Sequence, residues 1–201
     1  RILVSMTSSN QSNEQLAEKL RQFSEQYITV YQQKHGCLPT IEHDDEWPSP
    51  CEINATKRPI LPQGEVYWQP VNVEKSEELS FTNVESALEL TLHDDIKTYF
   101  TTLYSESIEA KCTEGELSLL FAWNKDDFER LQENLIGHIL MKRRLKQEET
   151  VFFAVTDEED MIISVDNVSG SVWVERVGCK PHKQLSDSLA QFISQLTPVV
   201  K

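Results

Sequence analysis

Two short clusters combine a histidine with neighbouring carboxylates, and they are the residues best suited to metal chemistry. They are His43-Asp44-Asp45-Glu46 and His93-Asp94-Asp95. Imidazole and carboxylate groups are common ligands of divalent cations. Neither cluster, however, has the spacing of an EF-hand loop or of a two-histidine zinc helix. A metal-assisted enzyme therefore stays open as a minor alternative, and we expect neither a metal nor another cofactor.

Signatures of other enzymes are absent from the sequence. The chain has 6 glycines, and their positions allow neither a phosphate-binding Walker loop nor a dinucleotide fingerprint. Cys51 lies near His43, but its acidic neighbours should raise the pKa of the thiol and so make it a poor nucleophile. Glu133 and His138 stand five positions apart, about 140° around a helix, so they are poorly placed as an acid–base pair. We expect a protein that is not an enzyme, with its four widely spaced cysteines as free thiols in a reducing cytosol.

Negative charge is concentrated in one part of the chain. The formal net charge is −14, from 33 acidic and 19 basic residues, and residues 37–127 alone hold 19 acidic and 6 basic ones, a net of −13. Such a balance argues against nucleic acid as a partner, because phosphate binding depends on Lys and Arg. Two interpretations remain: a solvated acidic surface that keeps the protein soluble, or a docking surface for a basic partner.

The length of 201 residues indicates one domain. Ser12 and Gln15 have capping-box spacing and precede an amphipathic helix that ends near Gly36. We therefore predict a flexible extension over residues 1–12, in which Met6 could be the natural start, and a single domain over residues 13–201. Five prolines between Cys37 and Gln63 predict a long ordered loop.

The rest of the chain alternates short strands and helices. A strand is predicted at Val66–Gln69, helices at 83–90 (capped by Asn83) and 93–103, and a hairpin from 107–113 and 117–123. Asn124 should cap the strongest helix, three strands follow at 151–155, 161–165 and 171–177, and a closing helix should span 185–196. Hairpin-connected strands with separate helices indicate the α+β class, with a mixed, mostly antiparallel sheet backed by helices.

Two further features allow a structural and a functional interpretation. Trp68 could form an apolar anchor at an interface or a buried strand aromatic. The basic run of Lys142, Arg143, Arg144 and Lys146 complements the dipole at a helix C-terminus, and it could also touch anionic lipid headgroups. No stretch approaches the roughly 20 apolar residues that cross a bilayer, so we expect any membrane role to be peripheral.

One run of the sequence resembles a known family. Residues Asp126–His138, preceded by Trp123 and followed by the basic run, are similar to the central motif of Syd, the SecY-interacting protein family. Further blocks agree in order, from residue 14 to about 199: Pro48–Cys51, Val66–Pro70, Tyr99–Thr102, Ile163–Val165 with Asn167–Gly170, and Leu189–Pro198.

The resemblance implies a non-enzymatic protein, loosely attached to the cytoplasmic side of the bacterial inner membrane through SecY. It implies binding of uncomplexed or abnormal SecY, as a scavenger or negative regulator, through an electronegative concave surface. It also implies the sheet and helices of the superfamily that includes toxin-immunity proteins. Cytoplasmic loops of SecY are rich in Lys and Arg by the positive-inside rule, which suits an acidic partner.

The matched blocks suggest which residues contact SecY. They are the acidic residues Glu85, Glu89, Asp126, Asp127 and Glu133, with Trp68 as the apolar contact. Asp44, Asp45 and Glu46 lie outside the matched blocks. We expect a monomer, and the main alternative is an immunity-type protein that neutralises a basic toxin through the same surface.

Overall fold

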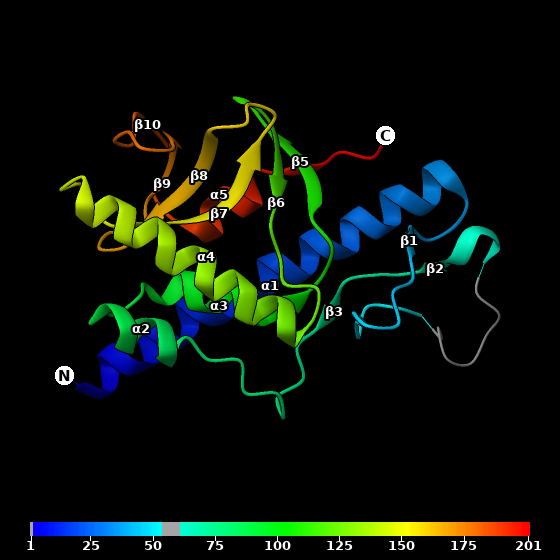
Figure 1. Cartoon of the computed structure of the whole chain (residues 1–201), viewed down its shortest axis with the longest axis horizontal. Helices are drawn as coiled ribbons and strands as arrows, with labels where there is room; N and C mark the ends of the chain where they lie inside the picture. The colour runs from blue at the N-terminus through cyan, green and yellow to red at the C-terminus, as the bar shows by residue number, and fades with distance from the viewer. Residues whose placement is uncertain (1, 54–60) are drawn as a thin grey trace.

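A seven-stranded antiparallel sheet forms the centre of the molecule (Figure 1). The structure, a computed structural model, describes residues 2–53 and 61–201, with side chains described from Ser8 onward. The strand order is β10-β9-β8-β7-β6-β5-β11. The strands are β5 (Ile108–Cys112), β6 (Gly115–Leu119), β7 (Thr150–Thr156), β8 (Met161–Asp166), β9 (Val172–Arg176), β10 (Lys183–Ser186) and β11 (Thr197–Pro198). The sheet curls, so that Lys183 of β10 reaches Glu114 in the distant β5–β6 turn and forms an ion pair with it.

Two smaller pairs of strands lie outside this sheet in the described part of the chain. β1 (Thr40–Glu42) pairs with β2 (Glu65–Tyr67), after the 3-10 helix η1 (Pro62–Gly64), and β3 (Val71–Asn72) pairs with β4 (Leu103–Tyr104). The long loop predicted between Cys37 and Gln63 therefore contains one short strand, while residues 54–60 lie outside the described part of the chain.

In residues 2–53 and 61–201, five α-helices pack around the sheet. They are α1 (Ile2–His35), α2 (Thr82–Leu88), α3 (Asp94–Thr102), α4 (Lys125–Arg144) and α5 (Leu189–Ser194). Figure 1 shows α4 in front and α1 behind the core, and α1 contacts both α3 and α5. Between them lie fully buried aromatic side chains such as Tyr99, Phe153 and Phe192. The predicted α+β class and antiparallel hairpins are confirmed.

Several predicted helix boundaries were wrong. α1 starts at Ile2, so Ser12 is inside the helix, and the boundary expected between residues 12 and 13 falls within α1. Ser9 Oγ donates to Asp94 of α3 at 3.0 Å, a distant contact that no local pattern reveals. Asn83 does not cap α2, because the helix begins at Thr82 and Asn83 is already its second residue; the N-cap position is Phe81, whose side chain makes no capping bond. Leu185 belongs to β10 and not to the closing helix, which starts at Leu189, because the residues on either side of it, Gln184 and Ser186, pair with β9.

The predicted cap of α4 is confirmed and ties the helix to the long loop. Asn124 Oδ1 accepts the Asp127 N–H at 2.7 Å, and Asp127 Oδ2 accepts the Trp123 N–H at 2.8 Å. The Asn124 amide also donates to the Pro48 carbonyl at 2.9 Å, and Ser49 Oγ donates to the Trp123 carbonyl at 2.5 Å. The N-terminus of α4 therefore fixes where the loop lies.

Removal of this cap gives a first prediction. Asn124→Ala is expected to lower the free energy of unfolding by about 1–2 kcal/mol, because it removes the capping acceptor and the bond to Pro48. Chemical denaturation measures the change. Asn124→Asp keeps the acceptor and should lose clearly less; equal losses in the two variants would contradict the capping role.

Within the described residues, no helix is both long enough and apolar enough to span a bilayer.

Candidate functional site: an acidic groove beside helix α4

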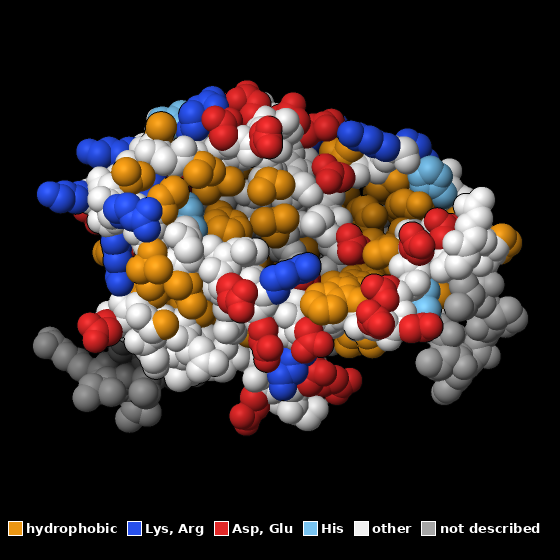
Figure 2. Space-filling view, viewed as in Figure 1, with side chains coloured by type: hydrophobic (Ala, Val, Ile, Leu, Met, Phe, Trp, Pro, Cys, Tyr) orange, Lys and Arg blue, Asp and Glu red, His pale blue; other side chains and the backbone are white. Residues whose placement is uncertain are grey.

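Three adjoining hollows form one groove around Glu106. Their volumes are about 270, 130 and 250 Å³, and Glu106 lines all three. One wall is the N-terminal half of α4 with Asp127 and Arg130, and the other is the loop around β1. Figure 2 shows acidic side chains around a hollow floored by hydrophobic ones, right of centre between α4 and β1. We call this the acidic groove; its carboxylates are Glu42, Asp44, Glu52, Glu106 and Asp127.

Aromatic side chains build the floor of the acidic groove. Trp68 stacks on Tyr27 with ring centroids 6.3 Å apart and meets Trp123 edge to face at 5.7 Å. Trp68 is 4% exposed, so it offers a partner little free surface and instead supports the floor. Of the two interpretations offered for Trp68, a buried aromatic fits the structure better than an exposed interface anchor.

Glu106 sits in an electrostatically unfavourable place. Its side chain is half-buried, and within the described part of the chain it forms no ion pair. Burial, and secondarily the negative charge of Asp127, raises the pKa of the Glu106 carboxyl above its ordinary value. A half-buried carboxylate without a cation gains more from an incoming Lys or Arg than an exposed one does.

The other groove carboxylates are partly engaged. Asp127 accepts the Trp123 N–H at the start of α4 and pairs with Arg130 at 2.6 Å, and Arg130 lies over the Trp47 ring at 5.3 Å. Arg130 is the one Lys or Arg among the described residues that line the acidic groove. Five carboxylates against one guanidinium leave the groove strongly negative, as a docking surface for a basic segment requires.

The structure separates the predicted contact residues. Asp127 lines the acidic groove, whereas Asp126 and Glu133 lie exposed on the same helix outside the lining. Glu85, on α2, accepts the Leu92 N–H at 2.9 Å and pairs with Lys97 at 3.3 Å. Glu89 follows α2 in a left-handed conformation with φ 49°. α2 contributes no described residue to the groove lining, so Glu85 and Glu89 are not brought together with Asp127.

Sequence reasoning did not select Glu42, Glu52 and Glu106 as contacts. Each lies in the acidic segment 37–127, so the charge count located the region. No local pattern singles out these three residues within the segment, because the Asn124–Pro48 bond that brings the loop to α4 joins positions 76 apart.

The histidine clusters have other roles in the structure. His43 Nε2 lies 2.7 Å from Asp45 and Nδ1 lies 2.8 Å from Glu52, which raises the pKa of His43, chiefly through the Asp45 hydrogen bond. His93 Nδ1 accepts the Asp95 N–H and caps α3. Across residues 2–53 and 61–201, no group of three His, Cys, Asp or Glu side chains is arranged to hold a metal. Burial raises the pKa of the Cys51 thiol to about 12, so the thiol stays protonated.

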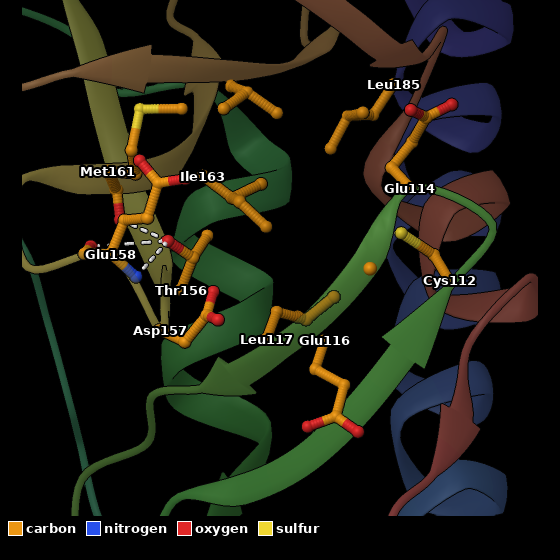
Figure 3. A pocket seen from close by; sticks show the side chains of 12 residues that line it. Cys112, Glu114, Glu116, Leu117, Thr156, Asp157, Glu158, Met161, Ile163 and Leu185 are labelled. Carbon is orange, nitrogen blue, oxygen red and sulfur yellow. Dashed lines mark hydrogen bonds between the residues drawn. The ribbon is translucent and has the colours of Figure 1, made fainter.

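A further hollow, of about 360 Å³, opens at the end of the curled sheet (Figure 3). Its floor is apolar, with Leu117, Ile163 and Leu185, and its rim carries Glu114, Glu116, Asp157 and Glu158. Two of these carboxylates are neutralised internally: Lys183 pairs with Glu114, and Arg176 pairs with Glu158 at 3.4 Å. The hollow is therefore less negative than the acidic groove and a weaker candidate for a basic partner.

Comparison with known proteins gives consistent matches. A family model described as Syd protein (SUKH-2) matches residues 17–198. A "Protein Syd" of Colwellia psychrerythraea is 62% identical over 199 residues, 96% of each chain. A "Protein Syd" of Pseudoalteromonas atlantica is 43% identical over 173 residues, 85% of this chain and 90% of the relative. One from Salmonella paratyphi B is 36% identical over 188 residues, 94% of this chain and 99% of the relative.

Proposed function

Because the chain belongs to the Syd family, we propose that it is a binding protein rather than an enzyme and that its acidic groove docks basic cytoplasmic loops of SecY. The observation that carries the proposal is Glu106, a half-buried carboxylate without an ion pair in the described residues, at the centre of five groove carboxylates. Short cytoplasmic loops of membrane proteins carry excess Lys and Arg. Such a loop would supply the cations that the groove lacks.

Binding of SecY loops in the acidic groove would make the chain a negative regulator. A protein that covers basic loops of SecY competes with any other partner that needs those loops. Binding would therefore favour uncomplexed or abnormal SecY and act negatively on translocation. In this proposal the chain is a monomer, held at the cytoplasmic side of the inner membrane through SecY, and its net charge of −14 disfavours nucleic acid.

Salt dependence tests the electrostatic part of this proposal. Binding to SecY in phosphatidylcholine nanodiscs should slow by about tenfold in association rate between about 0.15 M and 0.5 M salt, because salt screens steering over a Debye length of about 8 Å. Surface plasmon resonance measures the rate, and empty nanodiscs of the same lipid give the background.

A matched pair of variants assigns the effect to the acidic groove. Glu42→Gln/Asp44→Asn removes two groove charges and should slow association, whereas Glu25→Gln/Glu159→Gln removes two exposed charges outside the groove lining and should not. Equal slowing by both variants would mean that only net charge matters. A stable complex with a basic protein in solution, without binding to SecY discs, would favour the immunity-type alternative.

A further inference from the structure

The C-terminal end of α4 differs from the rest of the surface in polarity. Among the described residues, four large hydrophobic side chains are exposed: Leu140 at 46%, Leu145 at 45%, Val168 at 86% and Val177 at 47%. Leu140 and Leu145 belong to the end of α4, Val168 to the β8–β9 turn and Val177 to the β9–β10 turn. Isolated exposed apolar residues are ordinary, but a group of them at one place indicates an interaction site.

Two interactions bring the β9–β10 turn to the end of α4, and a third ties the β8–β9 turn to the segment that follows this helix. Lys142 Nζ donates to the Cys179 carbonyl at 3.0 Å, and Gln147 Nε2 donates to the Gly178 carbonyl at 3.3 Å. The Asn167 N–H donates to the Glu149 carbonyl at 3.1 Å. The four exposed hydrophobic side chains therefore surround one end of the molecule.

This end also carries positive charge. Arg144, Lys146 and Lys180 are exposed and form no ion pair within the described part of the chain. Figure 2 shows Lys and Arg beside hydrophobic side chains at the left end of the view, over the C-terminal half of α4. We call this surface the basic-apolar end, defined by Leu140, Arg144, Leu145, Lys146, Val168, Val177 and Lys180.

The structure refines which basic residues are available. Lys142 is fully buried and pairs with Glu175 at 2.8 Å, and Arg143 pairs with Glu149 at 2.6 Å. Of the basic run selected from sequence, Arg144 and Lys146 remain, and the β9–β10 turn adds Lys180. Glu148, two positions after Lys146, is an exposed acidic residue close to this run.

We infer that the basic-apolar end contacts an anionic lipid surface directly. Its cations would pair with headgroup phosphates, while the apolar tips would enter the boundary between headgroups and acyl chains. The apolar side chains of this group come from a helix end and two turns and not from one continuous element, so they suit a deformable lipid surface better than a protein partner, which needs roughly 800 Å² of complementary face.

The acidic groove does not oppose this contact. It lies beside the N-terminal half of α4, and a helix of 20 residues is about 30 Å long. Asp127, the groove carboxylate on this helix, precedes Arg144 by 17 residues, about 26 Å along the axis. This is about three times the Debye length of about 8 Å at physiological salt, so lipid charge at one end is screened from the groove. Both surfaces could then be engaged at once.

Vesicle binding tests the inference with the full chain. We expect flotation with vesicles of equal parts phosphatidylglycerol and phosphatidylcholine, and none with phosphatidylcholine alone. Arg144→Ser/Lys146→Ser should weaken this binding about 30-fold, and Leu145→Ser/Val168→Ser about tenfold. Lys75→Ser/Lys125→Ser, an equal change of charge at exposed sites elsewhere, should retain binding within about twofold.

The outcomes separate clearly. No preference for phosphatidylglycerol, or an equal loss in the Lys75→Ser/Lys125→Ser control, would overturn the inference. Glu106→Gln should retain vesicle binding, and Arg144→Ser/Lys146→Ser should retain binding to SecY in phosphatidylcholine discs. The lipid contact can therefore fail its test while the proposed SecY contact passes, and the SecY contact can fail while the lipid contact passes.

Discussion

Lys142→Met is expected to lower the free energy of unfolding by about 3–5 kcal/mol, because it leaves a buried carboxylate without its cation. Lys142 and Glu175 are both fully buried, with Nζ and Oε1 at 2.8 Å. Lys142 also donates to Gln147 at 3.0 Å, and Glu175 Oε2 accepts the Ser164 hydroxyl at 2.5 Å. The ion pair therefore joins α4 to β9 in the interior, and Glu175 Oε1 has no hydrogen-bond partner there other than this cation in the described residues.

The double variant Lys142→Met/Glu175→Leu is the matched control. Removal of both charges avoids the unpaired carboxylate and should recover most of the loss, because a buried ion pair is worth little against an apolar pair of similar volume. Denaturant unfolding of the wild type, both single variants and the double variant gives the coupling energy directly. Additive losses, or a loss below about 1 kcal/mol for Lys142→Met, would mean that the two groups are not coupled.

The Lys142–Glu175 ion pair also explains why the four residues of the basic run could not be told apart by sequence alone. Basic residues near a helix C-terminus suit the helix dipole, and that pattern treats Lys142 and Arg144 alike. Position on the helix separates them, since Lys142 is fully buried like Leu135 and Ile139, whereas Arg144 is exposed. Helical spacing puts position 142 on the same face as Leu135 and Ile139, but the carboxylate partner of Lys142 lies on a strand 33 positions later and left no local signal.

The parts of the fold that sequence predicted correctly have local causes. The Asn124 cap and the β5–β6 and β8–β9 hairpins depend on residues within a few positions of one another. The missed parts depend on distant partners. For example, β11 forms because it pairs with β5, far away in the sequence. Pro198 lies in this strand at the edge of the sheet, where proline is tolerated. The acidic groove is missed for the same reason, since Glu106 meets the β1 loop and α4 only after folding.

Glu106→Gln is expected to change stability and partner binding in opposite directions. Burial and Asp127 raise the pKa of Glu106 in the folded state, so the ionised carboxylate destabilises the fold at neutral pH. Since the folded-state pKa is above the unfolded value, the folded state binds the proton more tightly, and stability rises as pH falls through that window. The gain of Glu106→Gln over the wild type should therefore be largest above the raised pKa and shrink in acid, as measured by denaturation across pH.

The same substitution should weaken binding to SecY, because the Glu106 carboxylate, which lowers the stability of the free protein, is the group that a basic loop would neutralise. We expect Glu106→Gln to lose about 2 kcal/mol of affinity, roughly 30-fold, and Glu106→Lys to lose more than about a hundredfold through added repulsion. Glu116→Gln, an exposed strand glutamate outside the groove lining, should change stability by less than about 0.5 kcal/mol and leave affinity unchanged. Acidification toward the raised pKa of Glu106 should weaken binding in the wild type but not in Glu106→Gln. A Glu106→Gln protein that is more stable yet binds SecY as tightly as the wild type would show that the acidic groove is not the docking surface.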